Sequence, residues 1–177
     1  GSYWEANMEL IDIIPEFNLY EEYWKIYTKS DRIPPQYISS DAKITKCIIG
    51  EGSEIYGEVT NSVIGSGVVI EEGAVVKDSI IMQDSVIGKG AVVDKSIVAE
   101  DVKVGAGAHL GVGEYAPSKY DQKVYQFDLV TIGEHSVIPE NVKIGRNTAI
   151  SGVTTAEDYP NSELESGGYI VKAGGIV

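Results

Sequence analysis

The feature that most constrains the fold is an aliphatic residue that returns about every six positions. Residues 64–69, 70–75, 87–92 and 132–137 each begin with an isoleucine, and glycine follows it directly in three of the four segments. A short residue often stands two positions before the next aliphatic residue. This hexapeptide pattern is typical of a parallel β-helix, in which three short strands form one coil. We predict that the repeated aliphatic residue points inward, and that the short residue and glycine fit tight corners.

The composition favours an all-β protein. Val and Ile together number about forty, whereas Leu occurs only five times. β-Branched residues suit packed strands, and a helical protein of this size would use more leucine. The length fits one domain with appendages.

The repeat divides the chain into three parts. We predict an N-terminal helix and aromatic-rich connector over residues 1–37, a β-helix of four to five coils over 38–152, and a tail over 153–177 with one short strand along the coil surface. The hexads break at about 111–129, which we interpret as a functional or interaction loop. The predicted inward residues before this loop are Ile38, Ile44, Ile49, Ile55, Ile64, Ile70, Val76, Ile81, Ile87, Val93, Val98, Val104 and Leu110.

The first residues predict a short helix. Ser2 and Glu5 have the spacing of a capping box, and the helix should end before Pro15. Trp4, Met8 and Ile11 fall on one helical face, which we expect to have packed on a segment upstream in a longer protein. Gly1-Ser2 fits either native sequence or a cloning remnant. Residues 17–27 are expected to lie partly on the first coil, and Pro34-Pro35 to be extended.

The net charge and the cysteine content restrict the kinds of partner and the compartment that the sequence favours. The formal net charge of −13 argues against nucleic-acid binding, which needs clustered Lys and Arg. No apolar run approaches the roughly 20 residues of a membrane span. Cys47 is the only cysteine, so it forms no internal disulfide, which fits a reducing cytosol. It falls in a corner position and is interpreted as a compact hydrophobic residue.

Two segments outside the hexads resemble a known enzyme family. Ser2-Tyr3-Trp4-Glu5-Ala6-Asn7-Met8 and Pro34-Pro35-Gln36-Tyr37 are similar to the region after the catalytic domain of bacterial glucose-1-phosphate adenylyltransferase (ADP-glucose pyrophosphorylase). The resemblance continues through residues 57–64 and 73–82 to at least 110, and less distinctly to 150.

The resemblance implies a function that this chain does not complete alone. The family condenses ATP and glucose 1-phosphate into ADP-glucose and pyrophosphate for glycogen or starch synthesis, in the cytoplasm and with Mg²⁺. Its C-terminal domain is a left-handed β-helix for allosteric response and subunit contacts, and the parent is a homotetramer. The nucleotide loop and metal-binding aspartates belong to the N-terminal domain. We therefore expect no catalytic, cofactor or metal residue here, and no adenylyltransferase activity from the isolated chain.

The loop supplies the candidate site. In related enzymes, segments near these hexads help to bind anionic effectors, so Lys119 and Lys123 are candidate ligands of a phosphorylated metabolite. Outward aliphatic residues such as Val69, Val75 and Val92 are expected to form an apolar strip for assembly.

Other readings stay open. A hexapeptide acyltransferase would use His109 or His135 as a general base and bind coenzyme A. The C-terminal domain of another sugar-nucleotide synthetase, such as a mannose-1-phosphate guanylyltransferase relative, is a further alternative. Both histidines are expected at exterior positions, and two histidines fall short of the usual three ligands of a catalytic zinc site.

Overall fold

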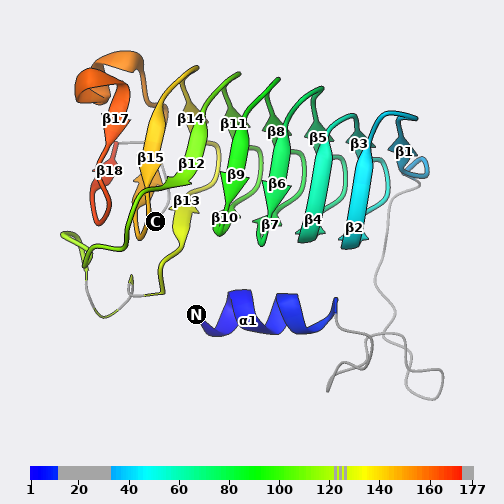
Figure 1. Cartoon of the computed structure of the whole chain (residues 1–177), viewed down its shortest axis with the longest axis horizontal. Helices are drawn as coiled ribbons and strands as arrows, with labels where there is room; N and C mark the ends of the chain where they lie inside the picture. The colour runs from blue at the N-terminus through cyan, green and yellow to red at the C-terminus, as the bar shows by residue number, and fades with distance from the viewer. Residues whose placement is uncertain (12–32, 122, 124, 126, 173–177) are drawn as a thin grey trace.

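The chain forms a parallel β-solenoid, and a short helix lies along its side (Figure 1). The computed structural model describes residues 1–11, 33–121, 123, 125 and 127–172. One wall of the solenoid is a six-stranded parallel sheet in the order β1 (Tyr37–Ile38), β3 (Glu54–Ile55), β5 (Val69–Ile70), β8 (Val86–Ile87), β11 (Lys103–Val104) and β14 (Val137–Ile138). Each coil contributes one strand to this wall, so the expected four to five coils is too low.

The other two walls are joined by long strands that turn a corner. β2 (Lys43–Ile49) and β4 (Glu58–Ile64) each run along both walls, and β4 bends at Asn61, whose φ is 45°. The second wall continues through β6 (Val75–Lys77), β9 (Val92–Asp94), β12 (His109–Val112), β15 (Lys143–Gly145) and β17 (Glu163–Leu164). The third wall continues through β7 (Ile80–Ile81), β10 (Ser96–Val98), β13 (Val130–Ile132), β16 (Ala149–Ser151) and β18 (Tyr169–Val171).

The hexapeptide β-solenoid predicted from the sequence is confirmed, and its left-handed sense stays a prediction. The inward residues from Ile55 to Leu110 are at most 3% exposed, as are Ile132, Ile138, Ile144 and Ile150 further along. Ile38 is instead 46% exposed, because β1 is the end strand of its wall and pairs only with β3. Ile44 and Ile49, in the first coil, are half-buried.

The C-terminal segment differs from the expected surface strand. After two 3₁₀ turns, Ala156–Asp158 and Pro160–Ser162, strands β17 and β18 pair in parallel with β15 and β16 and so extend the solenoid. Leu164 and Ile170 stand six residues apart and pack against the core. The hexad therefore resumes after an interruption, which hid it in the sequence.

Short side chains at one corner form a ladder of hydrogen bonds. Ser62 Oγ donates to the Thr60 carbonyl at 2.7 Å and accepts the Ser79 backbone N–H at 3.1 Å. Ser79 Oγ repeats this bond to the Ser96 N–H, also at 3.1 Å. Cys47 is the register partner of Ser62, and burial raises the pKa of its thiol. The sequence-based interpretation of Cys47 as a compact corner residue agrees with this position.

Helix α1 (Ser2–Glu9) packs on the third wall, whereas its predicted packing on an upstream segment stays a prediction. Trp4 Nε1 donates to the Asp78 carbonyl at 2.9 Å, and Met8 is buried. The helix ends before Pro15, as predicted. The predicted capping box is wrong, because Gly1 is the N-cap and Ser2 is already helical, with no side-chain cap bond. The aromatic residues of 17–27 lie outside the described residues, and Pro34-Pro35 belongs to neither helix nor strand.

Tyr159 is part of the buried core near the C-terminal end of the solenoid, and its burial should make the stability of the fold depend on pH. It is 2% exposed, and its hydroxyl lies 2.8 Å from Thr154 Oγ1. Thr154 gives its only hydroxyl proton to the Val137 carbonyl at 2.6 Å, so Tyr159 is the donor in that pair. Burial raises the pKa of Tyr159 to about 12, whereas an unfolded tyrosine titrates near 10.

Because the unfolded chain loses this proton first, the neutral tyrosine stabilises the fold below pH ~10, and that stabilisation is lost as the pH rises toward about 12. Tyr159→Phe should cost about 0.5–1.5 kcal/mol at neutral pH and flatten this alkaline loss. Urea unfolding between pH 8 and 11.5 measures both effects, with the exposed Tyr115→Phe as control. An equally steep alkaline loss in Tyr159→Phe would contradict the assignment.

Candidate functional site

The candidate site is the segment between β12 and β13, residues 113–129, which leaves the solenoid near its C-terminal end (Figure 1). Its middle is held against the last coil. The backbone N–H of Lys119 donates to the Gly167 carbonyl at 2.8 Å, and Asn147 Nδ2 donates to the Ala116 carbonyl at 2.9 Å. The buried Ser118 hydroxyl accepts the N–H of Tyr120 at 3.2 Å. Residues 116–120 therefore present their side chains from a backbone that is bonded to the last coil.

The two lysines predicted to bind an anion lie on this loop in different surroundings. Lys119 Nζ forms an ion pair with Glu165, and both side chains are more than half exposed. The Lys123 backbone N–H donates to Asp121 Oδ1 at 2.8 Å. An exposed ion pair contributes about 0–1 kcal/mol, so Glu165 holds the Lys119 side chain only weakly.

A charged cluster at the base of the loop was missed by the sequence analysis. Asp128 Oδ2 lies 2.8 Å from Arg146 Nη1 and 3.4 Å from Lys95 Nζ, and Arg146 Nη2 lies 3.9 Å from Asp94 Oδ2. The side chains of Asp94, Asp128 and Arg146 are only about a quarter exposed. Within the described part of the chain, the buried Asp128 Oδ1 and Arg146 Nε have no hydrogen-bond partner. The cluster fixes the point where the loop re-enters the coil.

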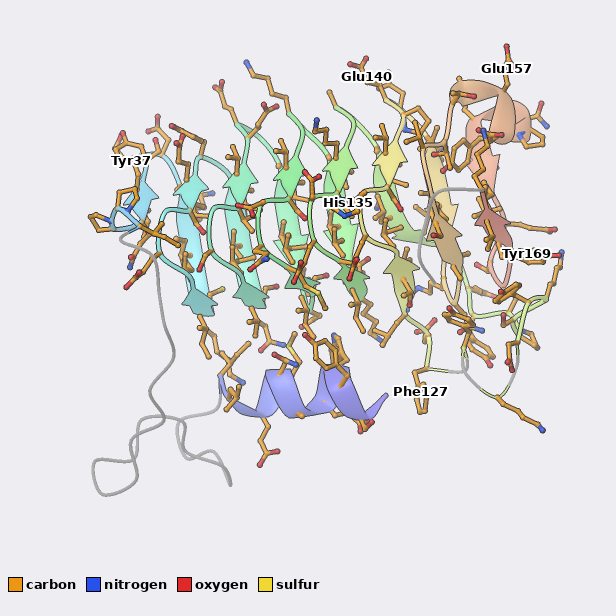
Figure 2. The ribbon with its side chains drawn as sticks, turned by 180° about the vertical axis from the view of Figure 1, so that it is seen from behind. Tyr37, Phe127, His135, Glu140, Glu157 and Tyr169 are labelled. Carbon is orange, nitrogen blue, oxygen red and sulfur yellow. The ribbon has the colours of Figure 1, made fainter. Side chains whose placement is uncertain are left out.

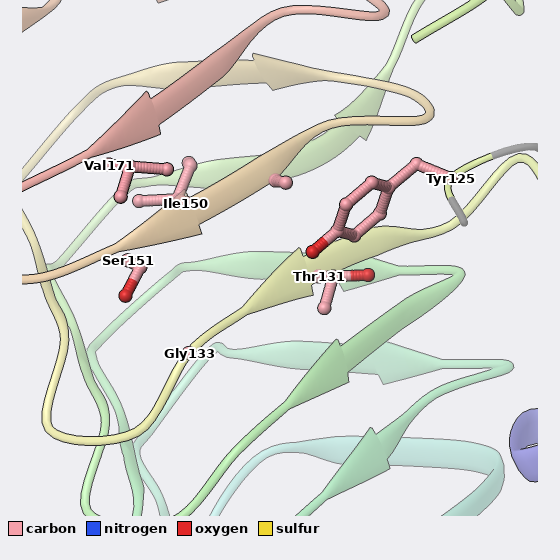
Figure 3. A pocket seen from close by; sticks show the side chains of 7 residues that line it. Tyr125, Thr131, Gly133, Ile150, Ser151 and Val171 are labelled. Carbon is pink, nitrogen blue, oxygen red and sulfur yellow. The ribbon is translucent and has the colours of Figure 1, made fainter. Parts of the chain in front are cut away.

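Aromatic residues line the side of the loop that faces the third wall. The Tyr120 ring centroid lies 4.9 Å from that of Tyr169 and 5.9 Å from that of Tyr125. Burial, followed by the neighbouring Tyr120 and Asp121, raises the pKa of Tyr125. Figure 3 shows Tyr125 over a pocket that Ile150 and Val171 also line.

The two histidines occupy the exterior positions expected of them. His109 precedes the buried Leu110 in β12 and has Val92 and Lys143 as register neighbours. His135 sits at a turn with φ 55°, exposed, and its Nδ1 lies 3.0 Å from Asp101 Oδ2 (Figure 2). No group of three His, Cys, Asp or Glu side chains among the residues the structure describes could hold a metal ion.

The single apolar strip predicted from outward valines is wrong. Val75 and Val92 are register partners on the second wall, whereas Val69 pairs with Val86 on the six-stranded wall. Val69 and Val75 are one hexad apart, and the strand order places neighbouring hexads on different walls. Val69 therefore lies on a different surface from Val75 and Val92.

Comparison with known proteins shows similarity to a hexapeptide-repeat family and to part of a longer enzyme. Residues 33–132 match the family described as GlmU-like, C-terminal hexapeptide. The chain is 74% identical over 174 residues to the glucose-1-phosphate adenylyltransferase of Lachnospira eligens, which covers 98% of this chain and 41% of that protein. It is 55% identical over 170 residues to the enzyme of the same name from Thermotoga neapolitana, covering 96% of this chain and 40% of that protein. The corresponding protein of Acetivibrio thermocellus is 42% identical over 173 residues, covering 98% and 41%.

The chain thus spans about two-fifths of the length of these relatives. In the part of the chain that the structure describes, no helix has the length and apolar character needed to cross a bilayer.

Proposed function

Because the chain belongs to the GlmU-like C-terminal hexapeptide family and is homologous to the C-terminal two-fifths of glucose-1-phosphate adenylyltransferase, we propose that it is the regulatory and assembly domain of such an enzyme. The full-length protein then converts ATP and glucose 1-phosphate into ADP-glucose and pyrophosphate for glycogen synthesis. We assign it to the cytoplasm, as a homo-oligomer that is a tetramer by resemblance.

The observation that carries the regulatory part of this proposal is the loop whose residues 116–120 are bonded to the last coil. A solenoid needs no such insertion, because β12 already pairs with β15 and β10 with β13. The 113–129 loop is nevertheless held by bonds to Gly167 and Asn147 and carries Lys119 at its surface. Long loops on a rigid scaffold commonly bind ligands, and the lysines suit a phosphorylated metabolite.

The chemistry belongs to the part of the enzyme outside this chain. The described residues offer no acidic cluster for Mg²⁺, and the chain has no glycine-rich loop between a strand and a helix for ATP. We therefore propose that ATP and Mg²⁺ bind the N-terminal part of the full-length enzyme, and that this chain alone is inactive.

Replacing Lys119 and Lys123 together with Ala in the full-length enzyme should raise the activator concentration for half-maximal stimulation about tenfold or more. Each lysine removed takes away a charge-assisted contact to a phosphate, and about 1.4 kcal/mol corresponds to tenfold in affinity. The basal rate should change less than about twofold, since the catalytic part is untouched. Initial rates with inorganic phosphate and a panel of sugar phosphates measure both quantities.

Two further variants sharpen this test. Lys143→Ala is the matched control, because Lys143 also pairs with a glutamate, Glu163, at 3.6 Å but lies on the coil. Glu165→Gln should lower the activator concentration needed, because it releases Lys119 from its ion pair. An unchanged activation curve in the double variant would return both lysines to ordinary surface.

A further inference from the structure

The loop and the C-terminal coils of the third wall form a small hollow of about 80 Å³ (Figure 3). Thr131 of β13, Ile150 and Ser151 of β16 and Val171 of β18 line it from the wall, and Tyr125 lines it from the loop. None of the described residues that line the hollow carries a charge. Apolar walls with a few hydroxyl groups are typical of a site for an uncharged ligand.

The clearest indication of a ligand is an unpaired hydroxyl in this hollow. Ser151 is 4% exposed, and its Oγ is buried without a hydrogen-bond partner in the part of the chain that the structure describes. Buried side-chain hydroxyls nearly always have a partner, so this exception needs an explanation. Thr131 adds a second hydroxyl, and Figure 3 shows the Tyr125 hydroxyl directed toward Thr131. A ligand with several hydroxyl groups can bond to all three side chains.

Three tyrosines form an aromatic cluster beside the hollow. The Tyr120 ring is tilted by 45° to that of Tyr169 and by 55° to that of Tyr125, so the three rings do not form one flat surface. Tyr169 is the register partner of Ala149, which lines the hollow, so the cluster and the hollow adjoin. Tyr120 and Tyr169 are 45% and 47% exposed. Tyrosine joins a large apolar ring to a polar hydroxyl, and the cluster therefore fits a ligand that is itself apolar on one face and polar at its edge.

The backbone positions of the tyrosines are fixed by hydrogen bonds. The N–H of Tyr120 donates to Ser118 Oγ at 3.2 Å, and the N–H of Tyr125 donates to the Asp121 carbonyl at 2.9 Å. Tyr169 belongs to β18, which pairs with β16. A ligand that binds rings held in this way loses little free energy to ordering them.

We propose that the hollow and the tyrosine cluster bind an uncharged glucan chain. A pyranose ring has an apolar C–H face that packs on an aromatic ring, and its hydroxyl groups can bond to Ser151 and Thr131. A volume of about 80 Å³ is well below the roughly 300 Å³ of the smallest common ligand pockets, so the hollow holds one sugar ring at most. The neighbouring rings of the chain then lie on Tyr120 and Tyr169.

The site disfavours two other classes of ligand. A phosphorylated ligand would find no cationic side chain among the described residues that line the hollow. A purely apolar ligand would leave the Ser151 hydroxyl buried and unpaired. The choice of glucose as the sugar rests on the proposed function, because an enzyme that makes ADP-glucose supplies the units of such a chain, whereas the site for a sugar ring rests on the geometry.

Native affinity electrophoresis of the full-length enzyme, in gels with and without glycogen, tests this proposal. Glycogen should retard the unmodified enzyme. The double variant Tyr120→Ser with Tyr169→Ser should raise the apparent Kd for glycogen about tenfold or more, because it removes two rings that pack on the chain. Tyr37→Ser with Tyr115→Ser is the matched control, since both are exposed tyrosines that do not belong to the cluster.

Ser151→Ala separates binding from folding. It removes a hydroxyl that has no partner among the described residues, so the urea midpoint of the free protein should stay the same or rise. The apparent Kd for glycogen should nevertheless rise about fivefold, because one hydrogen bond to the chain is lost. Ser136→Ala is the control with the opposite pattern. The buried Ser136 Oγ accepts the Gly152 N–H at 3.0 Å, so this variant should lower the midpoint and leave the Kd unchanged.

Three outcomes would overturn the proposal. Unchanged mobility of the unmodified enzyme in glycogen means that no glucan binds. Full retardation of the double tyrosine variant, or of Ser151→Ala, means that the glucan binds elsewhere. Competition by free glucose at the same concentration as maltoheptaose means that the site holds a single sugar and not a chain. The activation curves of the Lys119 and Lys123 variants are measured without glucan, so failure here is distinguishable from failure of the proposed function.

Discussion

Replacing Ile87 with Ala should lower the free energy of unfolding by about 2–5 kcal/mol, among the largest effects of any single substitution in this chain. Ile87 is fully buried in β8, with Ile70 and Val104 as register partners in the coils on either side. Removing three carbons leaves a cavity that neighbouring coils cannot close, because each inward position is fixed by its own strand pairing. The lost transfer energy and the cavity then act together.

Val86→Ala is the matched control for this prediction. Val86 is adjacent in the same strand but faces outward and is only half-buried, so its truncation should cost about 1 kcal/mol or less. Urea unfolding followed by circular dichroism measures both variants. Similar losses for Ile87→Ala and Val86→Ala would mean that the hexad does not separate inside from outside. Solenoids can unfold coil by coil, so both the midpoint and the slope of each urea unfolding curve should be compared.

The regular part of the solenoid follows from local sequence rules. A hexad with an aliphatic start and a short corner residue assigns inside and outside within six residues, and no distant contact is needed. Val93 and Leu110 were assigned correctly for this reason. Ile38 was not, because its burial depends on whether another coil stacks on β1, which a repeat cannot reveal.

The interrupted parts depend on contacts between distant residues. Leu164 and Ile170 keep the six-residue step, but two 3₁₀ turns separate them from Ile150 and disguise the last coil as a tail. Lys119 was found as a candidate from its place on the loop. Its partner Glu165 lies 46 residues later in the chain, and no spacing rule connects the two.

The outward residues that share one wall could be identified from the sequence only if the strand order were known. Ile80 and Ile97 each precede an inward residue, as do Val69 and Val86 on another wall. Hexad numbering alone does not say which of these positions share a surface. The corner bend in β4 and the strand register of the three walls determine which positions share a surface, and so determine which wall the helix covers.

Replacing Arg146 with Met should free the base of the loop and cost about 1–3 kcal/mol. Breaking a fully buried ion pair costs about 3–5 kcal/mol, and the quarter exposure of Arg146 and Asp128 reduces that figure through solvent screening. Among the described residues Asp128 would keep Lys95 as its one basic partner, at 3.4 Å, and Asp94 would lose its contact with Arg146. Amide exchange across 113–129 should therefore rise, while exchange in the coils before residue 110 stays the same.

A second substitution separates loss of the pair from loss of the side chain. Asp128 has φ 61°, a conformation that Asn tolerates, so Asp128→Asn removes the charge without straining the backbone. In the double variant, Arg146→Met with Asp128→Asn, no uncompensated carboxylate remains at position 128, so the total loss should be smaller than the sum of the two single losses. Lys143→Met is the control, because its exposed pair with Glu163 contributes little. Strict additivity, or unchanged exchange in the loop, would show that Arg146 and Asp128 act independently and that the loop is held by its bonds to Gly167 and Asn147 alone.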